Sequence, residues 1–261
     1  MTLKELIKPF YYNLKGKVDY YGFKHFCPIC TSQLKYFLPL PFEFEKERIE
    51  KGFKFSYKSY ETLNIKDYMC PNCSSSDRER LYVLYLKHIN FNETQVRVID
   101  FAPSKNFENK FKSIKNVSYQ SADLLRKDFD IIIDIENINL KDKSCDLFIC
   151  SHILEHIKNP KRALCELNRI MSDNGMGIVM VPIIPSVKTS IEIPCDSDDD
   201  RWKNHGQGDH LRIFGRNDFI NLLKSYFNLQ IIDKSHFDKK TLLKYGIDIN
   251  FKLYIVRKSN I

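Results

Sequence analysis

The stretch Cys145-Asp-Leu-Phe-Ile-Cys-Ser151 is apolar at nearly every position and ends in a hydroxyl side chain. A run this short and this apolar indicates a strand that is buried on both faces of a sheet. Apolar residues at helical spacing follow over Asn159 to Ser172, where Asn174-Gly175 is expected to stop the helix, and Gly177 to Pro182 is typical of a further strand. This strand–helix–strand order predicts a parallel sheet wound by right-handed crossovers.

The same alternation extends in both directions along the chain. A helix over Asp77 to Ile89 starts at a Ser/Asp capping signal, and a second helix is expected over Asn217 to Tyr226. An amphipathic stretch, Asn106 to Lys115, separates the first two strands. The last two strands are joined by a short, Lys-rich connection, which predicts an antiparallel pair. The additional strands are expected at Val96–Asp100, Val117–Ala122, Asp130–Ile135, Leu229–Lys234 and Phe251–Lys258. The predicted fold class is therefore α/β with a seven-stranded, mostly parallel sheet.

Polar residues follow the predicted strands at the edge where such sheets bind ligands. In open α/β sheets the ligand lies beyond the carboxyl ends of the strands. An acid at the end of the second strand can bind both ribose hydroxyls of a nucleoside cofactor. The chemistry is expected at Asp100–Ser104, Asp123, Asp134, Ser151–His156 and the loop after Pro182.

The eight cysteines divide into two groups. Four of them form two C-x-x-C motifs, Cys27-Pro-Ile-Cys30 and Cys70-Pro-Asn-Cys73. Two such motifs complete a tetrahedral site of four thiolates, which suits Zn2+. A redox pair is the alternative, but neither motif has a thioredoxin-like setting. We therefore expect a structural zinc in a small zinc-ribbon-like module over residues 1–76, followed by the α/β domain over 77–261. The remaining cysteines are expected to act as small buried apolar residues; they are Cys145, Cys150, Cys165 and Cys195.

Composition bounds the class of protein. Hydrophobic residues make up 43% and charged residues 28% of the 261 residues, as in a globular protein. The net charge of +8 is scattered, without an Arg/Lys stripe interleaved with aromatics, so we do not expect a nucleic-acid partner. No apolar run approaches the ~20 residues of a membrane span, and Met1 to Phe10 lacks a signal-peptide core. We expect a cytoplasmic protein without a membrane span; the oligomeric state stays open.

The segments Asp146–Ile157 and Ala163–Arg169, with Gly175, resemble the class I S-adenosylmethionine-dependent methyltransferases of the type 11-like kind. The similarity runs more narrowly to a bacterial subgroup associated with lipopolysaccharide or surface-glycan biosynthesis. It covers Cys70 to Phe227 and implies a Rossmann-like fold. The motifs that carry this narrower resemblance are Cys70–Arg80, Asp100–Ser104, Tyr119–Leu124, His152–His156 and Gly206–Gly215.

The resemblance implies roles for residues at the strand ends. Asp100, Phe101, Ala102 and Pro103 would line the methionine and ribose side of S-adenosylmethionine, and Asp123 would hold the ribose hydroxyls. Asp134 and Ile135 would flank the adenine, and Ser151 and His152 would lie near the sulfonium. Ala102 and Pro103 stand where glycines are usual in this fold, and Ser104 replaces an acid of the subgroup.

The catalytic candidates are His152, His156 and His210 as general bases and Arg212 as a clamp for a carboxylate or phosphate of the acceptor. Three alternatives stay open. Glu155 and His156 can simply anchor the next helix, and His210 and Arg212 can order their own loop. His152, Glu155 and His156 have the spacing i, i+3, i+4 and can share a cation if they lie on one helical turn.

Three functions follow. The first is methyl transfer to a small molecule or glycan precursor, on oxygen or nitrogen. The second is an RNA or protein methyltransferase that uses the zinc module to hold its substrate. The third is a binding module without catalysis, motivated by the glycine-poor turn at Ala102. The identity of the acceptor cannot be read from the residues.

Overall fold

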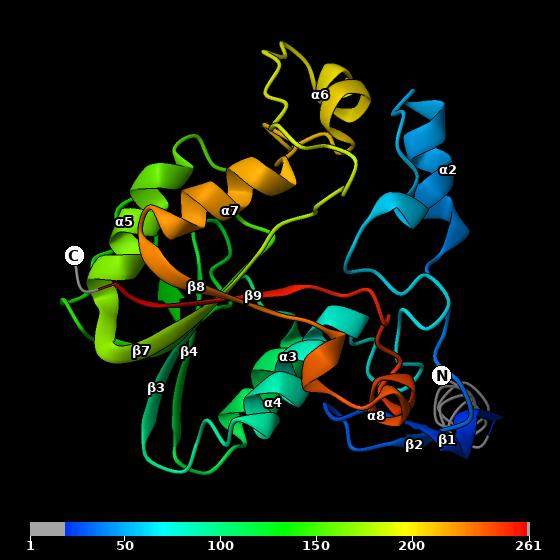
Figure 1. Ribbon diagram of the computed structural model, residues 1–261, viewed down its shortest axis with the longest axis vertical. Helices are drawn as coiled ribbons and strands as arrows, with labels where there is room; N and C mark the ends of the chain where they lie inside the picture. The colour runs from blue at the N-terminus through cyan, green and yellow to red at the C-terminus, as the bar shows by residue number, and fades with distance from the viewer. Residues whose placement is uncertain (1–18, 260–261) are drawn as a thin grey trace, which may run out of the picture.

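The computed structural model describes residues 19–259, and its centre is a seven-stranded sheet (Figure 1). In space the strands follow the order β5-β4-β3-β6-β7-β9-β8. The first five run parallel, and β9 is antiparallel to both of its neighbours. The predicted mostly parallel sheet with an antiparallel end is therefore confirmed. The strands are β3 (Val96–Phe101), β4 (Val117–Asp123), β5 (Ile131–Ile132), β6 (Cys145–Ser151), β7 (Met171–Met180), β8 (Phe227–Ile232) and β9 (Leu253–Lys258).

Helices cover both faces of the sheet (Figure 1). On one face are α3 (Asp77–His88) and α4 (Lys105–Lys112), and on the other are α5 (Pro160–Ile170) and α7 (Arg216–Lys224). Helix α3 begins with a capping box, in which Ser76 and Glu79 satisfy each other's backbone N–H groups. Helix α5 begins with proline at its first position and an Asn159 cap. These signals explain why both helices start where the sequence predicts.

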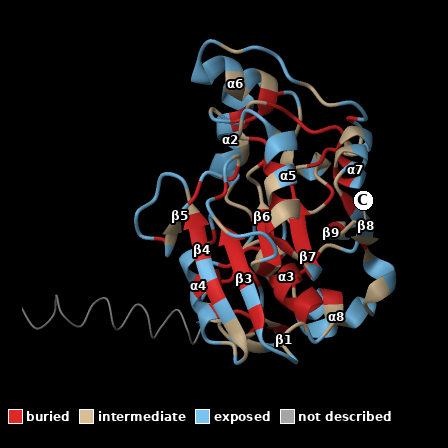
Figure 2. Ribbon diagram, turned by 90° about the vertical axis from the view of Figure 1, so that its left-hand side faces the viewer, coloured by how far each residue is buried: buried red, intermediate tan, exposed pale blue. Residues whose placement is uncertain are grey.

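The core is densest around β6. Its residues Leu147 to Cys150 are at most 1% exposed, and Figure 2 shows β6 and the end of β7 buried along their length. Gly177 of β7 lies over the Phe148 ring, where an added Cβ would collide with the ring. A glycine is needed here because the two strands approach closely around an aromatic side chain.

The N-terminal segment packs on this body and extends past the carboxyl ends of the strands. It contains a short antiparallel pair, β1 (Tyr21–Phe26) and β2 (Gln33–Leu34), followed by α2 (Phe42–Glu50) and the turn η1 (Tyr57–Ser59). Strand β1 contacts α8 (Lys239–Lys244), and Leu34 and Phe37 belong to the same core as the sheet. The division at residue 76 stays a prediction, but the two parts share one core.

At the opposite end from β1, α2 lies near α6 (Asp198–His205), as both views show (Figures 1 and 2). An exposed ion pair between Lys51 and Asp199 joins the two segments. This end of the molecule is where the strands β3, β4 and β6 terminate, so the N-terminal segment and the α6 loop enclose the edge at which a ligand is expected.

Several predicted bounds were wrong. The strand expected over 130–135 pairs at two residues only, because Asp134 turns the chain back on Asn137. The helix expected to reach Ser172 ends at Ile170, because Met171 is already extended and pairs with β6. The connection between the last two strands holds α8 and the turn η2 (Lys234–His236). The prediction for Met1 to Phe10 lies outside the described residues. Within 19–259, every helix is too short or too polar to cross a bilayer.

Candidate active site and cysteine cluster

The carboxyl ends of β4, β3 and β6 form one continuous edge. Phe101 of β3 pairs with Ala122 on one side and with Cys150 on the other. The next residue, Ala102, is exposed and has φ of 52°, in the left-handed region that favours glycine. Phe101 and Pro103 are buried on either side of it. The backbone at Ala102 is therefore the part of this turn that faces outward.

Asp100 lies inside the sheet. It is 1% exposed, and the Tyr119 hydroxyl donates to its Oδ2 at 2.8 Å. Burial raises the pKa of Asp100 well above its usual value. The carboxyl of Asp100 thus braces two neighbouring strands below the turn, and a ligand at this edge would meet Ala102 instead.

The two acids at the ends of β4 and β5 each stabilise a turn. Asp123 Oδ1 accepts from the backbone N–H groups of Leu125 and Arg126 at 2.7 and 2.9 Å, which leaves Oδ2 for another partner. Asp134 Oδ1 accepts from the Glu136 N–H at 2.8 Å, and Ile135 is buried beside it. In both residues, Oδ1 is the oxygen that accepts the hydrogen bonds of the turn.

The end of β6 is shaped by an unusual backbone. Ser151 Oγ lies 2.7 Å from the Tyr82 hydroxyl, and His152 has φ of 58°. A non-glycine residue in this region is strained, and such strain concentrates at functional sites. The His152 N–H still bonds to the Met180 carbonyl at 2.8 Å, so the backbone of this turn is tied to the end of β7.

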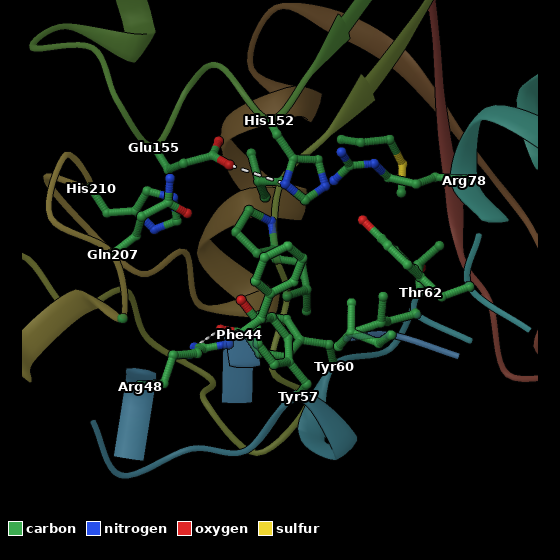
Figure 3. Close-up of a pocket in the computed structure, with 18 of the residues that line it drawn as sticks. Phe44, Arg48, Tyr57, Tyr60, Thr62, Arg78, His152, Glu155, Gln207 and His210 are labelled. Atoms are coloured by element: carbon green, nitrogen blue, oxygen red, sulfur yellow. Dashed lines mark hydrogen bonds and ion pairs between the residues drawn. The ribbon is translucent and has the colours of Figure 1, made fainter. Parts of the chain in front are cut away.

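A cavity of about 300 Å³ opens at the carboxyl ends of β6 and β7 (Figure 3). The N-terminal segment closes one side with Phe44, Tyr57 and Tyr60, and helix α3 contributes Arg78. The remaining walls come from the turn after β6, the end of β7 and the residues that follow it, and the loop after α6, and include His152, Glu155, His156, Met180, Gln207 and His210. Segments from five parts of the chain therefore meet in one hollow.

A cluster of three histidines and one glutamate lines this cavity. His152 Nδ1 lies 3.3 Å from Glu155 Oε1, and Figure 3 shows the His152 ring between Glu155 and Arg78. The His156 and His210 rings meet edge-to-face at a centroid distance of 4.6 Å. Ligand atoms of Glu155, His156 and His210 all lie within 4.8 Å of one another. The residues after Ser151 form turns and no helix, so the sequence spacing that joined His152 to this set does not apply.

The charge states of the cluster follow from its burial. Burial, reinforced by the Arg78 guanidinium, lowers the pKa of His152 to about 4. Burial also lowers the pKa of His210. For Glu155, burial acts to raise the pKa, but the neighbouring histidines outweigh it and lower the pKa below its usual value. Burial therefore favours the neutral form of His152 and His210, and the Glu155 carboxyl beside them favours its ionised form.

Two arginines at the cavity were missed by sequence reasoning. The Arg78 guanidinium is at the cavity wall and, among residues 19–259, has neither a hydrogen-bond nor an ion-pair partner. The Arg48 guanidinium stacks on Tyr57 and Phe53, with 4.2 and 4.4 Å from Cζ to the ring centroids. The Arg-rich start of α3 could have indicated Arg78. Arg48 lies in a segment in which the sequence shows no motif.

Arg212, which was predicted to clamp an anionic group of the acceptor, is instead engaged with other residues of the protein. It is 3% exposed and donates to the carbonyls of Leu154 and Ile157 at 2.9 and 2.5 Å. It also pairs with Glu192 at 3.0 Å. All its donors face protein groups, which supports the loop-ordering alternative for Arg212. His210, by contrast, faces the cavity.

The four cysteines of the two C-x-x-C motifs meet in one cluster. Sγ atoms are 3.7 Å apart in the pairs Cys27–Cys73 and Cys30–Cys70, and all four lie within 4.8 Å of one another. A zinc ion with bonds of about 2.3 Å to four tetrahedral sulfurs would place those sulfurs about 3.8 Å apart. The spacing of the thiols therefore fits the group that the sequence predicts.

Both motifs also have the same backbone. Cys27 N donates to Ser32 O at 3.0 Å and Cys70 N donates to Ser75 O at 2.9 Å, five residues on in each case. The fourth residue after each first cysteine, Thr31 or Ser74, has φ of 58° or 56°. Two matched turns that aim four thiols at one point are the expected construction of a four-thiolate metal site.

The other cysteines divide differently from the prediction. Cys145 and Cys150 are fully buried, as expected. Cys165 is exposed and Cys195 is half-buried. The prediction was wrong for Cys165 because this residue lies on the outward face of α5, whose buried face carries Ala163, Leu164 and Leu167.

Comparison with known proteins finds a family match for the central part of the chain. Residues 81–179 match a family described as "Methyltransferase domain". No curated protein matches the sequence. The match spans the strands β3 to β6 and most of β7, and it confirms the prediction of an S-adenosylmethionine-dependent methyltransferase. S-adenosylmethionine is the cofactor that this family implies.

Solved structures with a similar arrangement are distant in sequence. Phosphoethanolamine N-methyltransferase 2 of Haemonchus contortus is 12% identical, with a TM-score of 0.47 over 70% of this chain and 53% of that one. The protein PH0226 of Pyrococcus horikoshii OT3 is 16% identical, with a TM-score of 0.46 over 69% and 89%. The [4+2]-cyclase SpnF is 12% identical, with a TM-score of 0.45 over 69% and 80%.

Proposed function

We propose that this enzyme transfers a methyl group from S-adenosylmethionine to an oxygen or nitrogen of a small molecule or glycan precursor. The observation that carries the proposal is the cavity of about 300 Å³ beside His152. Pockets for small molecules begin at about this volume. The hollow is closed on one side by the N-terminal segment, and a cavity of this kind suits a compact acceptor group better than an extended polymer.

The proposed cofactor site lies along the adjoining edge of the sheet. Asp123 keeps Oδ2 for a ribose hydroxyl while Oδ1 holds its own turn. At Ala102 the left-handed backbone reproduces the conformation that glycine usually supplies, and its small side chain permits close approach. When bound, S-adenosylmethionine supplies an electrophilic methyl group on a sulfonium. Ser151 and His152 join this edge to the cavity, which brings cofactor and acceptor together.

In the proposed chemistry, His152 is the general base. The acceptor lone pair forms a bond to the methyl carbon, the carbon–sulfur bond breaks, and its electron pair stays on sulfur. His152 Nδ1 faces Glu155 at 3.3 Å, which leaves Nε2 to take the proton of the acceptor. Burial keeps the imidazole neutral and therefore able to accept that proton. The chain otherwise acts by alignment of the two reactants.

Arg78 is the proposed anchor for an anionic group of the acceptor. A guanidinium at a cavity wall without a protein partner is available for a carboxylate or phosphate. The aromatic side chains Phe44, Tyr57 and Tyr60 line the facing wall, where they can pack on a ring. This combination favours an acceptor with both a ring and an anionic group, such as a nucleotide sugar or a phosphorylated glycan precursor.

We further propose that the cysteine cluster holds a structural Zn2+. Support comes from the 3.7 Å spacing of the paired sulfurs and from the two matched turns. Arg80 adds a connection, because its buried guanidinium donates to the Ser75 carbonyl at 2.9 Å and stacks on Phe37 at 3.8 Å. The ion would fix the N-terminal segment in the position from which it closes the cavity.

The test is a screen of nucleotide sugars and surface-glycan precursors for transfer of a labelled methyl group from S-adenosylmethionine. We expect transfer to an anionic acceptor by the wild type and none by Asp123→Asn, which keeps the turn acceptor but removes the charge. Binding of RNA with a steep salt dependence, together with transfer to RNA alone, would contradict the proposal and favour a nucleic-acid substrate.

A further inference from the structure

The cluster Glu155, His156 and His210 contains a buried carboxylate that the protein itself does not satisfy. Glu155 is 0% exposed, and neither of its carboxylate oxygens has a hydrogen-bond partner among the described residues. The nearest nitrogen, His152 Nδ1, is 3.3 Å away but at an angle that makes no hydrogen bond. A buried carboxylate without donors is costly, and it is retained where a cation or a proton donor completes it.

The two imidazoles are placed to complete it. One ligand atom from each of Glu155, His156 and His210 lies within 4.8 Å of the others. Tetrahedral ligands at about 2.0–2.1 Å from a metal stand roughly 3.4 Å apart. The ligand atoms therefore lie at most about 1.4 Å farther apart than the ligands of a tetrahedral metal site.

The surrounding contacts hold the cluster together. His210 comes from the loop after α6, and the next residue, Leu211, donates its N–H to the Glu155 carbonyl at 2.8 Å. Arg212 then fastens the same loop to the turn after β6 through the Leu154 carbonyl. Asp209 Oδ2 lies 3.2 Å from His156 Nδ1. A carboxylate on one ring nitrogen is the usual companion of a metal-bound histidine, because it orients the ring and leaves the other nitrogen for the metal.

We propose that Glu155, His156 and His210 bind a divalent transition-metal ion of the Zn2+ class, separate from the ion of the cysteine cluster. Two imidazoles and one carboxylate form a ligand set of catalytic zinc sites, in which the fourth position stays open. All three residues line the cavity, so the open position faces the acceptor. The sequence spacing suggested a set with His152; the fold replaces His152 by His210.

The role of the ion at this position rests on the proposed function. An acceptor hydroxyl that coordinates the ion becomes more acidic, as water does on zinc. Its proton passes to His152, its oxygen forms the bond to the methyl carbon, and S-adenosylhomocysteine leaves with the electron pair of the broken carbon–sulfur bond. The metal stays at the same oxidation state throughout, so no redox partner is needed.

The experiment counts metal and does not depend on turnover. Tag-free protein is saturated with Zn2+, freed of unbound ion by gel filtration, and its zinc per chain is measured by mass spectrometry. We expect Glu155→Gln and His210→Ala to hold one equivalent less than the wild type. Glu93→Gln and His88→Ala, matched changes at exposed residues outside the cluster, should hold the wild-type amount. The difference between variants is the readout, so it is valid whatever the cysteine cluster binds.

Cobalt substitution separates the two clusters. Co2+ bound by cysteines shows thiolate charge-transfer absorption, whereas Co2+ on imidazoles and a carboxylate does not. We expect Glu155→Gln to lose the absorption of Co2+ bound by imidazoles and a carboxylate. The thiolate charge-transfer absorption of the cysteine cluster should remain. Equal metal content in wild type and both variants, with circular dichroism showing all of them folded, would overturn the proposal. If the variants lose one equivalent of metal but the wild type transfers no methyl group, the metal site stands and only the proposed function is contradicted.

Discussion

The cysteine cluster and the Glu155 cluster are assembled in similar ways but differ in how far they are closed. Each joins segments that lie far apart in the sequence, residues 27–30 with 70–73 and residues 155–156 with 210. The cysteine cluster offers four thiols at nearly tetrahedral spacing. The Glu155 cluster offers three ligands and opens on a cavity. A complete ligand set is suited to hold structure, and an incomplete one beside a cavity is suited to chemistry.

The largest effect that separates the two regions is expected from Cys27→Ser. Structural zinc in zinc-finger peptides contributes about 10–16 kcal/mol, as much as the whole stability of a typical domain, about 5–15 kcal/mol. The variant should lose zinc and unfold at the temperature at which the wild type is stable. Thermal denaturation followed by circular dichroism measures this. Cys165→Ser is the matched control, because Cys165 is exposed on α5 and should tolerate the change. Wild-type stability in Cys27→Ser would remove the structural role of the cluster.

At His152, which lies beside the Glu155 cluster, we expect a substitution to lower turnover while the protein stays folded. His152→Asn removes the imidazole but retains a residue that tolerates the left-handed backbone at this position. Loss of a general base lowers turnover by about 10²–10⁴-fold. Binding of S-adenosylhomocysteine and the melting temperature should stay near the wild-type values. Turnover that is unchanged in this variant would exclude His152 as the base.

An intermediate effect is expected at the cavity wall. Arg78→Gln removes a guanidinium without a protein partner in residues 19–259, so the fold should lose nothing. Hydrogen bonds to a charged group contribute about 1.5–3 kcal/mol, which corresponds to roughly a 10- to 150-fold increase in the KM of an anionic acceptor. Arg126→Gln, at an exposed arginine paired with Asp128, serves as the control. An increase in the KM of the cofactor, with that of the acceptor unchanged, would place Arg78 at the cofactor instead.

The smallest effect is expected at the turn after β3. Ala102→Gly relieves a left-handed conformation that costs roughly 1–2 kcal/mol in non-glycine residues, partly offset by the greater freedom of glycine in the unfolded chain. The net result should be a rise of about 1 kcal/mol or less in the free energy of unfolding, with cofactor affinity at least equal to that of the wild type. Ala163→Gly, in the buried face of α5, should destabilise by about 1 kcal/mol instead. Destabilisation by Ala102→Gly would show that the turn is not strained.

Local patterns predicted the parts of the molecule that local physics determines. The apolar run at Cys145–Ser151 predicted the central strand, and the spacing within each C-x-x-C motif predicted a pair of metal-ligand thiols, because both depend on neighbours in the sequence. That the two motifs meet was inferred from their similarity, since four thiolates complete one site. The cavity depends on tertiary packing. Nothing near Glu155 in the sequence indicates His210, which the Leu211–Glu155 backbone bond brings to it. Arg212 was expected to face a ligand, but in the fold backbone carbonyls and the Glu192 carboxylate take its donors.

The family match and the proposed use of the cavity both require that the protein binds S-adenosylmethionine. Cofactor binding is therefore the most direct test of the proposed methyl transfer. Calorimetric titration of the zinc-loaded protein with S-adenosylmethionine should give saturable one-to-one binding in the micromolar range, and Asp123→Asn should bind far more weakly. No heat of binding at high micromolar S-adenosylmethionine, in protein shown to be folded, would contradict a catalytic methyltransferase and leave a binding module of the same fold.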